Sequence, residues 1–257
     1  MRLLYPCDAF DSKQPDEIYQ AEYAAAKAAG IACSLFRMED FECGDFRPRP
    51  AFEAGEQVIY RGWMLSPDNY AFLHAAIYKK GATPLTSVVQ YRYCHYLPEW
   101  YATCEDFTPK TIFTTKDTNF KALLADVNWQ AYFIKDYVKS LTTSRGSVAR
   151  NIDDITEVIR QIEKYKGNIE GGICIREYED LLPETEERYF VFRAKAFSRN
   201  GIVPELVQQI ATRIDSPFFS VDIVQAANGD LRLIELGDGQ VSDIKKWPVE
   251  AFVHMFV

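Results

Sequence analysis

Two acidic residues in the last quarter of the chain are spaced so that a hairpin would bring them together. Asn228-Gly229 is a strong short signal for a two-residue type I′ turn, because that turn needs positive φ at both central residues. Counting outward pairs Ala227 with Asp230 and places Asp222 opposite Glu235. Carboxylates directly opposite one another lie about 5 Å apart at Cβ and repel by roughly 3 kcal/mol at an effective dielectric near 20. The pair therefore predicts a protonated carboxyl group or a bound cation.

A magnesium ion suits these two carboxylates, because it keeps several waters and takes one or two protein carboxylates together with phosphate oxygens. Asp238, between two glycines just past the second strand, is the candidate third ligand; a plain Gly-Asp-Gly turn is the alternative. If the turn is shifted by one residue, Asp222 and Glu235 point to opposite faces and each is solvated or salt-bridged instead. The predicted register therefore implies magnesium-dependent phosphate chemistry.

The first hundred residues alternate short apolar strands with helices, which predicts crossover units and a mostly parallel sheet. Gly30 and Gly81 are placed to end the two helices, and Ser66-Pro67 suits the start of the second. The expected strands are Arg2–Pro6, Ile31–Phe36 and Gln57–Tyr60, and the expected helices are 18–29 and 67–80. This part should be a small α/β domain, 1–107.

The second part, 108–257, begins after an aromatic-rich stretch, 90–107, that we interpret as a helix or compact connection. Its pattern changes from mixed to strand-dominated, which predicts an α+β domain with antiparallel hairpins and a hinge near 172–180. The expected helices are Asn119–Val127 and Asp153–Tyr165. The expected strands are Thr111–Thr114, Ala131–Val138, Gly172–Tyr178, Arg188–Ser198, Phe218–Val224 and Leu231–Leu236.

The composition limits the classes of protein to which this chain can belong. With 37 acidic and 29 basic residues its net charge is −8, which disfavours a nucleic-acid partner. No apolar run approaches the roughly 18 residues that a membrane-spanning helix needs, so no membrane contact is expected. The six cysteines are not closely paired and the N-terminus lacks a signal-peptide pattern. We therefore expect a cytoplasmic protein.

Several motifs occur in a recognisable order: a strand lysine, a short loop with a glycine, a helix, a hinge strand, an arginine strand and the carboxylate hairpin. They are Phe133-Ile-Lys135, Ser144-Arg145-Gly146, Gly172 to Tyr178, Glu186-Glu-Arg188, Ser220-Val-Asp222 and Ile234 to Gln240. This order resembles the ATP-grasp fold ligase family, and is most similar to an uncharacterised clade named for two arginines and one lysine. The resemblance covers about Thr108 to Asp243 and implies that ATP and Mg2+ are bound.

The resemblance implies a role for each motif. Lys135 would contact the α- and β-phosphates of ATP, and Arg188 the γ-phosphate. The Ser144-Arg145-Gly146 loop would fold over the triphosphate, Ile175 would lie by the adenine, and Glu177 would lie close to the ribose. Members commonly carry asparagine two residues after the metal-binding glutamate, where this chain has Gly237.

Two of the implied contacts are less defined. Lys116 is the preferred second phosphate lysine, with Lys110 as the alternative. Arg193 or Lys195 could add a further phosphate contact only if a bulge or twist turned it inward, because both lie on the face opposite Arg188 in a regular strand. A lysine or arginine on a half-buried strand is otherwise a surface group with its apolar stem buried.

We therefore expect an ATP-dependent carboxylate-amine ligase that joins a small carboxylate to an amine, amino acids or a peptide among them, through an acyl phosphate. One alternative is a degenerate ATP-binding module that acts through protein partners. Another is a metal-dependent phosphohydrolase, which also uses paired carboxylates. The motifs do not identify the acceptor or the amine.

The remaining chemistry-bearing residues carry weaker signals. Arg61-Gly62-Trp63 follows a strand end, where α/β sheets bind ligands, so it could receive an anionic acceptor; an exposed arginine beside a buried tryptophan is the alternative. Cys174 should be an inert buried thiol. The three histidines, His74, His95 and His254, are scattered and lack metal-ligand spacing. The aromatic residues Tyr91, Tyr93, Tyr96, Trp100 and Tyr101 could form the wall of a substrate cleft or belong to the core.

Overall fold

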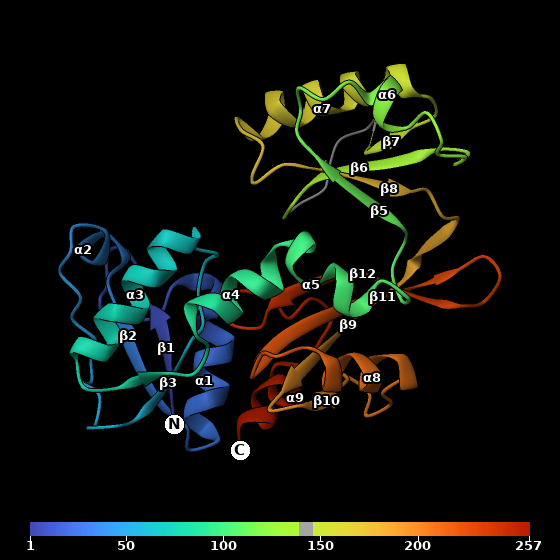
Figure 1. Cartoon of the computed structure of the whole chain (residues 1–257). Helices are drawn as coiled ribbons and strands as arrows, with labels where there is room; N and C mark the ends of the chain where they lie inside the picture. The colour runs from blue at the N-terminus through green and yellow to red at the C-terminus, as the bar shows by residue number, and fades with distance from the viewer. Residues whose placement is uncertain (139–145) are drawn as a thin grey trace. The chain divides into compact units, whose positions relative to one another are not determined.

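The computed structural model describes residues 1–138 and 146–257 and divides the chain into two compact units. Unit 1 comprises 1–94, 188–221 and 236–257, and unit 2 comprises 95–187 and 222–235. Figure 1 shows the order of the elements along the chain. The division at 107/108 that the sequence indicates stays a prediction.

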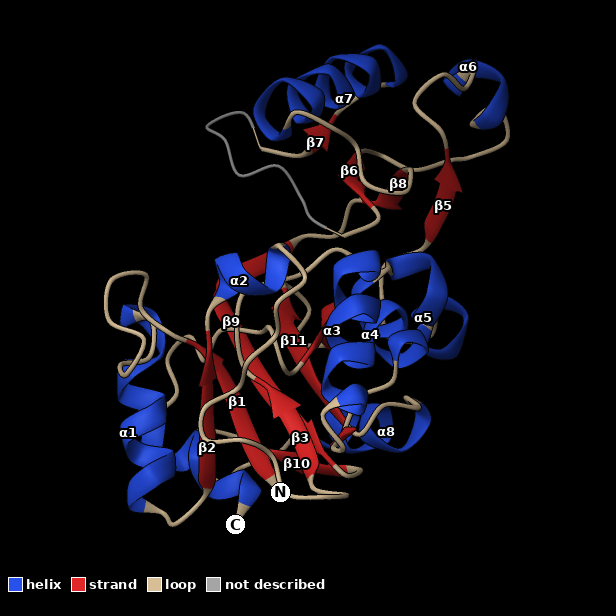
Figure 2. Ribbon diagram, turned by 90° about the vertical axis from the view of Figure 1, so that its left-hand side faces the viewer, coloured by secondary structure: helices blue, strands red, loops and turns tan. Residues whose placement is uncertain are grey.

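Unit 1 contains a parallel sheet in the order β2-β1-β3-β4, which confirms the expected α/β start of the chain (Figure 2). Its side chains alternate between two cores. Leu3 and Tyr5 pack with α1, whereas Leu4 packs with α2 and α3. The strands are β1 (Arg2–Pro6), β2 (Ala32–Phe36), β3 (Gln57–Tyr60) and β4 (Thr83–Pro84).

The helices around this sheet begin and end where local side chains satisfy their free backbone groups. Ser66 accepts a hydrogen bond from the N–H of Asn69, and Pro67 occupies the first turn of α3. The N-terminal helical elements are η1 (Glu17–Tyr19), α1 (Gln20–Ala28), α2 (Met38–Glu42), α3 (Pro67–Lys79) and α4 (Val88–His95). The later ones are α8 (Glu205–Arg213), α9 (Val249–Val253) and η2 (His254–Phe256), for which the sequence analysis made no prediction.

Unit 2 is built on an antiparallel sheet in the order β5-β8-β6-β7. One face is covered by α7, whose buried Ile155, Val158, Ile159 and Ile162 recur at helical spacing (Figure 1). Asn151 caps this helix and Gly167 ends it in the left-handed conformation. The elements are β5 (Thr111–Thr114), β6 (Tyr132–Asp136), β7 (Val148–Ala149), β8 (Ile173–Glu177), α5 (Leu97–Cys104), α6 (Phe120–Leu123) and α7 (Ile152–Lys166).

A third sheet has the order β10-β9-β11-β12, and three of its strands contribute residues to both units. The expected single strand Arg188–Ser198 is wrong, because Arg193 and Ala194 both have positive φ and form a tight turn between β9 and β10. The strands are β9 (Leu181–Phe192), β10 (Lys195–Phe197), β11 (Phe218–Ala226) and β12 (Leu231–Asp238).

Two further sequence expectations are refined by the structure. The helix expected over Asn119–Val127 is the shorter α6, which Asn119 caps. The stretch 90–107 contains most of α4 and all of α5, so it is helical, and its aromatic residues are used for packing: Tyr91 stacks on Tyr70 at 3.9 Å between ring centroids. Within the described ranges, no helix has the length and apolar character needed to cross a membrane.

Candidate functional site

A pocket of about 370 Å³ lies in unit 2, within the size range of small-molecule binding sites. Its walls come from the three strands of the β6–β7–β8 sheet region and from β9, β11 and β12. The apolar lining includes Phe133, Val148, Leu181, Val224 and Ile234, and the charged lining includes Lys135, Arg176, Glu177, Glu179, Glu186 and Glu235. An apolar cavity with a few charged groups suits a flat ring attached to a charged tail.

Lys135 reaches the pocket because of its position in β6. Ile134 faces the core under α7, so its neighbours Phe133 and Lys135 face the other way and both line the pocket. The Lys135 ammonium is nearly buried and lies 3.3 Å from Oε1 of Glu235, and it donates to the carbonyl of Val138 at 3.2 Å. A buried ammonium with one partly exposed carboxylate beside it is a suitable group for a phosphate oxygen.

Arg176 is a pocket residue that the sequence analysis did not identify. It lies on β8, is 4% exposed, and donates to the carbonyl of Ile234 at 3.1 Å and to the hydroxyl of Thr108. Burial lowers its pKa to about 10, which still leaves it charged at neutral pH. Within the part of the chain that the structure describes, its Nε has no hydrogen-bond partner. The alternation of β8 is the signal that could have revealed it, because Arg176 lies between Ile175 and the predicted ribose residue Glu177.

The same alternation corrects the expectation for Ile175. Its side chain is fully buried in the core under α7, and its backbone lies in mid-sheet, paired with Ile112 and Ile134. The pocket is instead lined by Arg176, Glu177 and the residues that follow them. Cys174 is also fully buried, and burial raises the pKa of its thiol to about 12, as expected for an inert cysteine.

The turn of the β11–β12 hairpin differs from the predicted type I′ turn. The N–H of Ala226 donates to the carbonyl of Asp230 at 2.8 Å, and the N–H of Gly229 donates to the carbonyl of Ala226 at 2.8 Å. Gly229 has φ 93°, whereas Asn228 does not have positive φ. The loop therefore comprises three residues, Ala227 to Gly229, and the predicted pairing of Ala227 with Asp230 is wrong.

The two ends of the hairpin have registers that differ by one residue. At the far end the N–H of Gly239 donates to the carbonyl of Phe218 at 3.1 Å. Between this bond and the bond from Ala226 to Asp230, β11 advances eight positions and β12 advances nine, so β12 contains one extra residue. The far end thus has the register in which Asp222 faces Glu235. Their direct opposition stays a prediction that depends on where along β12 the extra residue lies.

The structure gives Asp238 other partners than the predicted metal. Its fully buried Oδ1 accepts from the backbone N–H and the side-chain amide of Gln240 at 2.9 and 3.0 Å, and burial raises its pKa to about 7. Among residues 1–138 and 146–257, no group of three or more His, Cys, Asp or Glu side chains could hold a metal ion. Asp222, which is 2% exposed, and Glu235 therefore remain as the candidate pair.

Gly237 occupies the position at which the resemblance predicts asparagine, and it lies close to two serine side chains. A Cβ at this position would lie 2.8 Å from the hydroxyl oxygens of both Ser220 and Ser242. Those two hydroxyls are hydrogen-bonded to each other at 2.8 Å, so any larger residue would displace them. An asparagine at 237 would therefore require the side chains of Ser220 and Ser242 to move.

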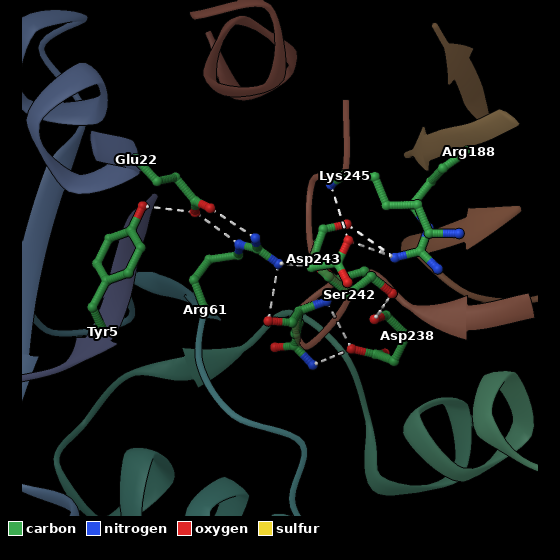
Figure 3. Close-up of polar contacts among 10 residues, drawn as sticks. Tyr5, Glu22, Arg61, Arg188, Asp238, Ser242, Asp243 and Lys245 are labelled. Atoms are coloured by element: carbon green, nitrogen blue, oxygen red, sulfur yellow. Dashed lines mark hydrogen bonds and ion pairs between the residues drawn. The ribbon is translucent and has the colours of Figure 1, made fainter. Parts of the chain in front are cut away.

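The predicted arginines both lie in unit 1. Nη1 of Arg188 donates to the carbonyl and the carboxylate of Asp243 at 3.0 and 3.3 Å (Figure 3). Arg193 lies in the β9–β10 turn, where it donates to Gln57 at 2.6 Å and its guanidinium stacks over the ring of Phe192. The structure thus gives Arg193 a role in the turn rather than the predicted position along a strand, and Lys195 stacks on Phe197.

The two candidate phosphate lysines are clearly separated in unit 2. Lys110 is exposed and lies 3.9 Å from Glu177, which lines the pocket, and its neighbour Pro109 also lines it. Lys116 donates to Glu163 of α7 at 2.6 Å, and this contact raises its pKa. The geometry thus favours Lys110 over Lys116. Of the predicted triphosphate loop, Ser144 and Arg145 lie outside the described residues, and Gly146 has φ 68°.

The structure reverses the expectation for the Arg61-Gly62-Trp63 segment. Arg61 is 1% exposed and its guanidinium bonds to Glu22 and to backbone carbonyls, whereas Trp63 is 45% exposed. Arg61 is therefore buried, and each of its three side-chain nitrogens already donates to a group of the protein. A sequence pattern cannot show this, because the partners of Arg61 come from distant parts of the chain.

The parallel N-terminal sheet, the antiparallel sheets that follow and the pocket with its strand lysine define a protein of the ATP-grasp fold. Residues 108–256 match the family described as ATP-grasp domain, R2K clade family 3. This match covers more than half of the chain, which therefore belongs to that family. No curated protein matches the sequence.

Solved structures agree over the whole chain at low sequence identity. The RimK domain ATP-grasp protein from Sphaerobacter thermophilus DSM 20745 has a TM-score of 0.62 and 13% identity, with 100% of this chain and 98% of that chain covered. D-cycloserine synthetase DcsG has a TM-score of 0.61 and 14% identity, with 100% of this chain and 98% of that chain covered. The macrocyclase MdnC from Microcystis aeruginosa MRC has a TM-score of 0.63 and 12% identity, with 99% of each chain covered. At these identities the likeness shows the fold.

Proposed function

We propose that this chain is an ATP-dependent carboxylate-amine ligase that works through an acyl phosphate. The observation that carries the proposal is the unit 2 pocket, in which apolar strand residues are combined with the buried ammonium of Lys135 beside Glu235. In this proposal the apolar part holds an adenine ring, Glu177 contacts the ribose, and Lys135 contacts phosphate oxygens. The family match supports nucleotide binding by this part of the chain.

In the proposed reaction an oxygen of the substrate carboxylate attacks the γ-phosphorus of ATP. The bond from that phosphorus to the β–γ bridging oxygen breaks, and ADP leaves with the electron pair. The amine nitrogen then attacks the acyl carbon, inorganic phosphate leaves, and the nitrogen loses a proton. Lys135 and Arg188 would offset the charge that develops on the phosphoryl oxygens. No protein nucleophile is needed.

Asp222 and Glu235 would hold a magnesium ion. Two carboxylates fit this ion, since it takes one or two protein carboxylates and completes its shell with waters and phosphate oxygens. When bound, magnesium neutralises charge on the β- and γ-phosphate oxygens. Lys135 lies 3.3 Å from Glu235, which supports a role for both residues at the same phosphate groups.

The names of structurally similar proteins support amino acids or peptides as substrates. They include D-cycloserine synthetase, D-alanyl-alanine synthetase A from Vibrio cholerae and a macrocyclase bound to its precursor peptide. We propose the same broad class for this chain, an amino acid or peptide carboxylate and an amine.

The test is an ADP-release assay on the full chain with ATP and magnesium against a panel of amino acids and short peptides, followed by mass measurement of the product. We expect ADP release that depends on both an acceptor and magnesium, and a product lighter by one water than its two substrates combined. Glu235→Gln and Asp222→Asn should each abolish ADP release while the chain remains folded. Glu157→Gln on α7, which removes a surface contact with Arg160, is the matched control.

Three results would contradict the proposal in different ways. ATP binding without ADP release across the panel would identify a nucleotide-binding module that acts through partners. ADP release that water alone supports would identify a phosphohydrolase. Full turnover by Glu235→Gln and Asp222→Asn would contradict the assignment of these two carboxylates as magnesium ligands.

A further inference from the structure

Arg61 is held in unit 1 by a forked pair of hydrogen bonds. Its Nε and Nη2 donate to the two carboxylate oxygens of Glu22 at 2.8 and 2.7 Å, and the hydroxyl of Tyr5 also donates to Glu22 at 3.0 Å (Figure 3). The guanidinium lies 4.6 Å from the centre of the Phe252 ring. A planar guanidinium that forms two hydrogen bonds to one carboxylate and packs on an aromatic ring is fixed in orientation.

The remaining nitrogen of Arg61 holds the segment that follows β12. Nη1 lies 2.5 Å from the carbonyl oxygen of Gly239 and 3.1 Å from those of Gln240 and Ser242. Without Arg61 the carbonyls of Gly239 and Ser242 would lose this donor at a cost, whereas that of Gln240 also accepts from the N–H of Gly62 at 3.3 Å. Arg61 therefore helps to set the path of residues 239–242.

The next residue in this segment carries the contact to Arg188. Asp243 accepts from Nη1 of Arg188 through its carbonyl and through Oδ1, which also accepts from the N–H of Lys245 at 2.9 Å (Figure 3). A continuous set of contacts thus runs from Glu22 through Arg61 and residues 239–242 to Asp243 and Arg188. All of these residues belong to unit 1.

We propose that Arg61 is a positioning residue, which sets the path of residues 239–243 and thereby the place of the Arg188 guanidinium. It does not touch substrate, since its side chain is buried and each of its three nitrogens already has an acceptor. This inference rests on the proposed function for the role of Arg188 at the γ-phosphate. The physical part, control of residues 239–243 and Arg188, stands on the contacts alone.

The kinetic test uses Arg61→Lys, Arg188→Ala and the double variant. Lysine keeps the charge but cannot bond Glu22 in a fork and hold three carbonyls together. We expect Arg61→Lys to lower kcat for ADP release on the order of 10²-fold, with KM for ATP within about threefold of the wild type. In the Arg188→Ala background the same change should have little further effect, because both substitutions remove one function. Additive losses would overturn the proposal.

Arg2→Lys is the matched control. Arg2 is also a buried arginine in unit 1 and donates to Glu56 at 2.7 Å, to Ser34 and to the carbonyl of Cys33, but it does not contact residues 239–243. Its replacement should lower the thermal midpoint while kcat stays near the wild-type value. A loss of kcat equal to that of Arg61→Lys would show that general destabilisation, and not positioning, causes the effect.

A second measurement does not require activity. Hydrogen exchange should be faster in residues 239–245 of Arg61→Lys than of the wild type or Arg2→Lys, and Glu22→Gln should give a smaller change in the same direction. The two Nη signals of Arg188 should be separate in NMR spectra of the wild type, where Asp243 slows rotation, and averaged in Arg61→Lys. Unchanged exchange and unchanged signals would overturn the inference even if no acceptor for the enzyme is found, whereas absence of ADP release in the wild type bears on the proposed function.

Discussion

Lys135 and Glu235 are one hundred residues apart in the chain, and their charged atoms lie 3.3 Å apart at the edge of the unit 2 pocket. The Lys135 side chain is 5% exposed and the Glu235 side chain 41% exposed, so the lysine is desolvated while the glutamate can still receive a second cation. A buried charge needs a partner, and here the partner is a proposed metal ligand. This relationship links the lysine of one strand to the carboxylate hairpin.

Removing the Lys135 ammonium should weaken nucleotide binding directly. We expect Lys135→Ala to raise the Kd for MgATP on the order of tenfold or more, because a desolvated charge contact with phosphate is lost. Calorimetric titration measures this change. Lys121→Ala, which removes an exposed lysine paired with Asp153, should leave Kd unchanged. Equal Kd values for wild type and Lys135→Ala would exclude Lys135 from the nucleotide site.

Lys110 and Lys116 should differ in their effect on the nucleotide. Lys110 lies beside Glu177 at the pocket, whereas Lys116 is held by Glu163 on α7. We expect Lys110→Ala to raise the Kd for MgATP by roughly threefold at low salt, and less at high salt, because its charge is exposed and screened. Lys116→Ala should have the smaller effect. The opposite order would restore Lys116 as the second phosphate lysine.

The β9–β10 turn should be stabilised by a glycine. Ala194 has φ 61°, a conformation that costs a residue with a Cβ about 1 kcal/mol. We expect Ala194→Gly to raise the free energy of unfolding by up to about 1 kcal/mol. In contrast, Ala196→Gly in β10, where Ala196 pairs with Val191, should lower it. Denaturant titration of both variants checks the prediction. A lower free energy of unfolding for Ala194→Gly would contradict the strain that we infer at this residue of the turn.

Asp238 should make stability depend on pH. Burial raises its pKa from 3.8 to about 7, so between these values the folded protein keeps a proton that the unfolded chain has released. Its contribution is therefore complete below about pH 4 and is lost as the pH rises through about 7. We expect Asp238→Asn, which resembles the protonated acid, to lose less stability than the wild type between about pH 5 and pH 8. Thermal midpoints across this range test it, and parallel curves would contradict it.

Local sequence patterns were sufficient for most of the elements. The short apolar strands β1, β2 and β3, which alternate with helices, predicted the parallel sheet that the structure contains. Asn228-Gly229 correctly located a hairpin. The helices α8 and α9 were not predicted, and neither has a side-chain N-cap hydrogen bond, although Val207, Ile210 and Ala211 of α8 recur at helical spacing. The turn at Arg193-Ala194 was missed because it lacks glycine.

By itself the sequence determined which residues could do chemistry: the strand lysine Lys135 and the acidic pair Asp222 and Glu235. Only the tertiary structure decided how they are used. One extra residue in β12 sets the register of the hairpin, and a turn signal cannot reveal it because the signal ends at the turn. The burial of Arg61 and the pairing of Lys135 with Glu235 depend on partners far along the chain, and only folding brings such partners into contact.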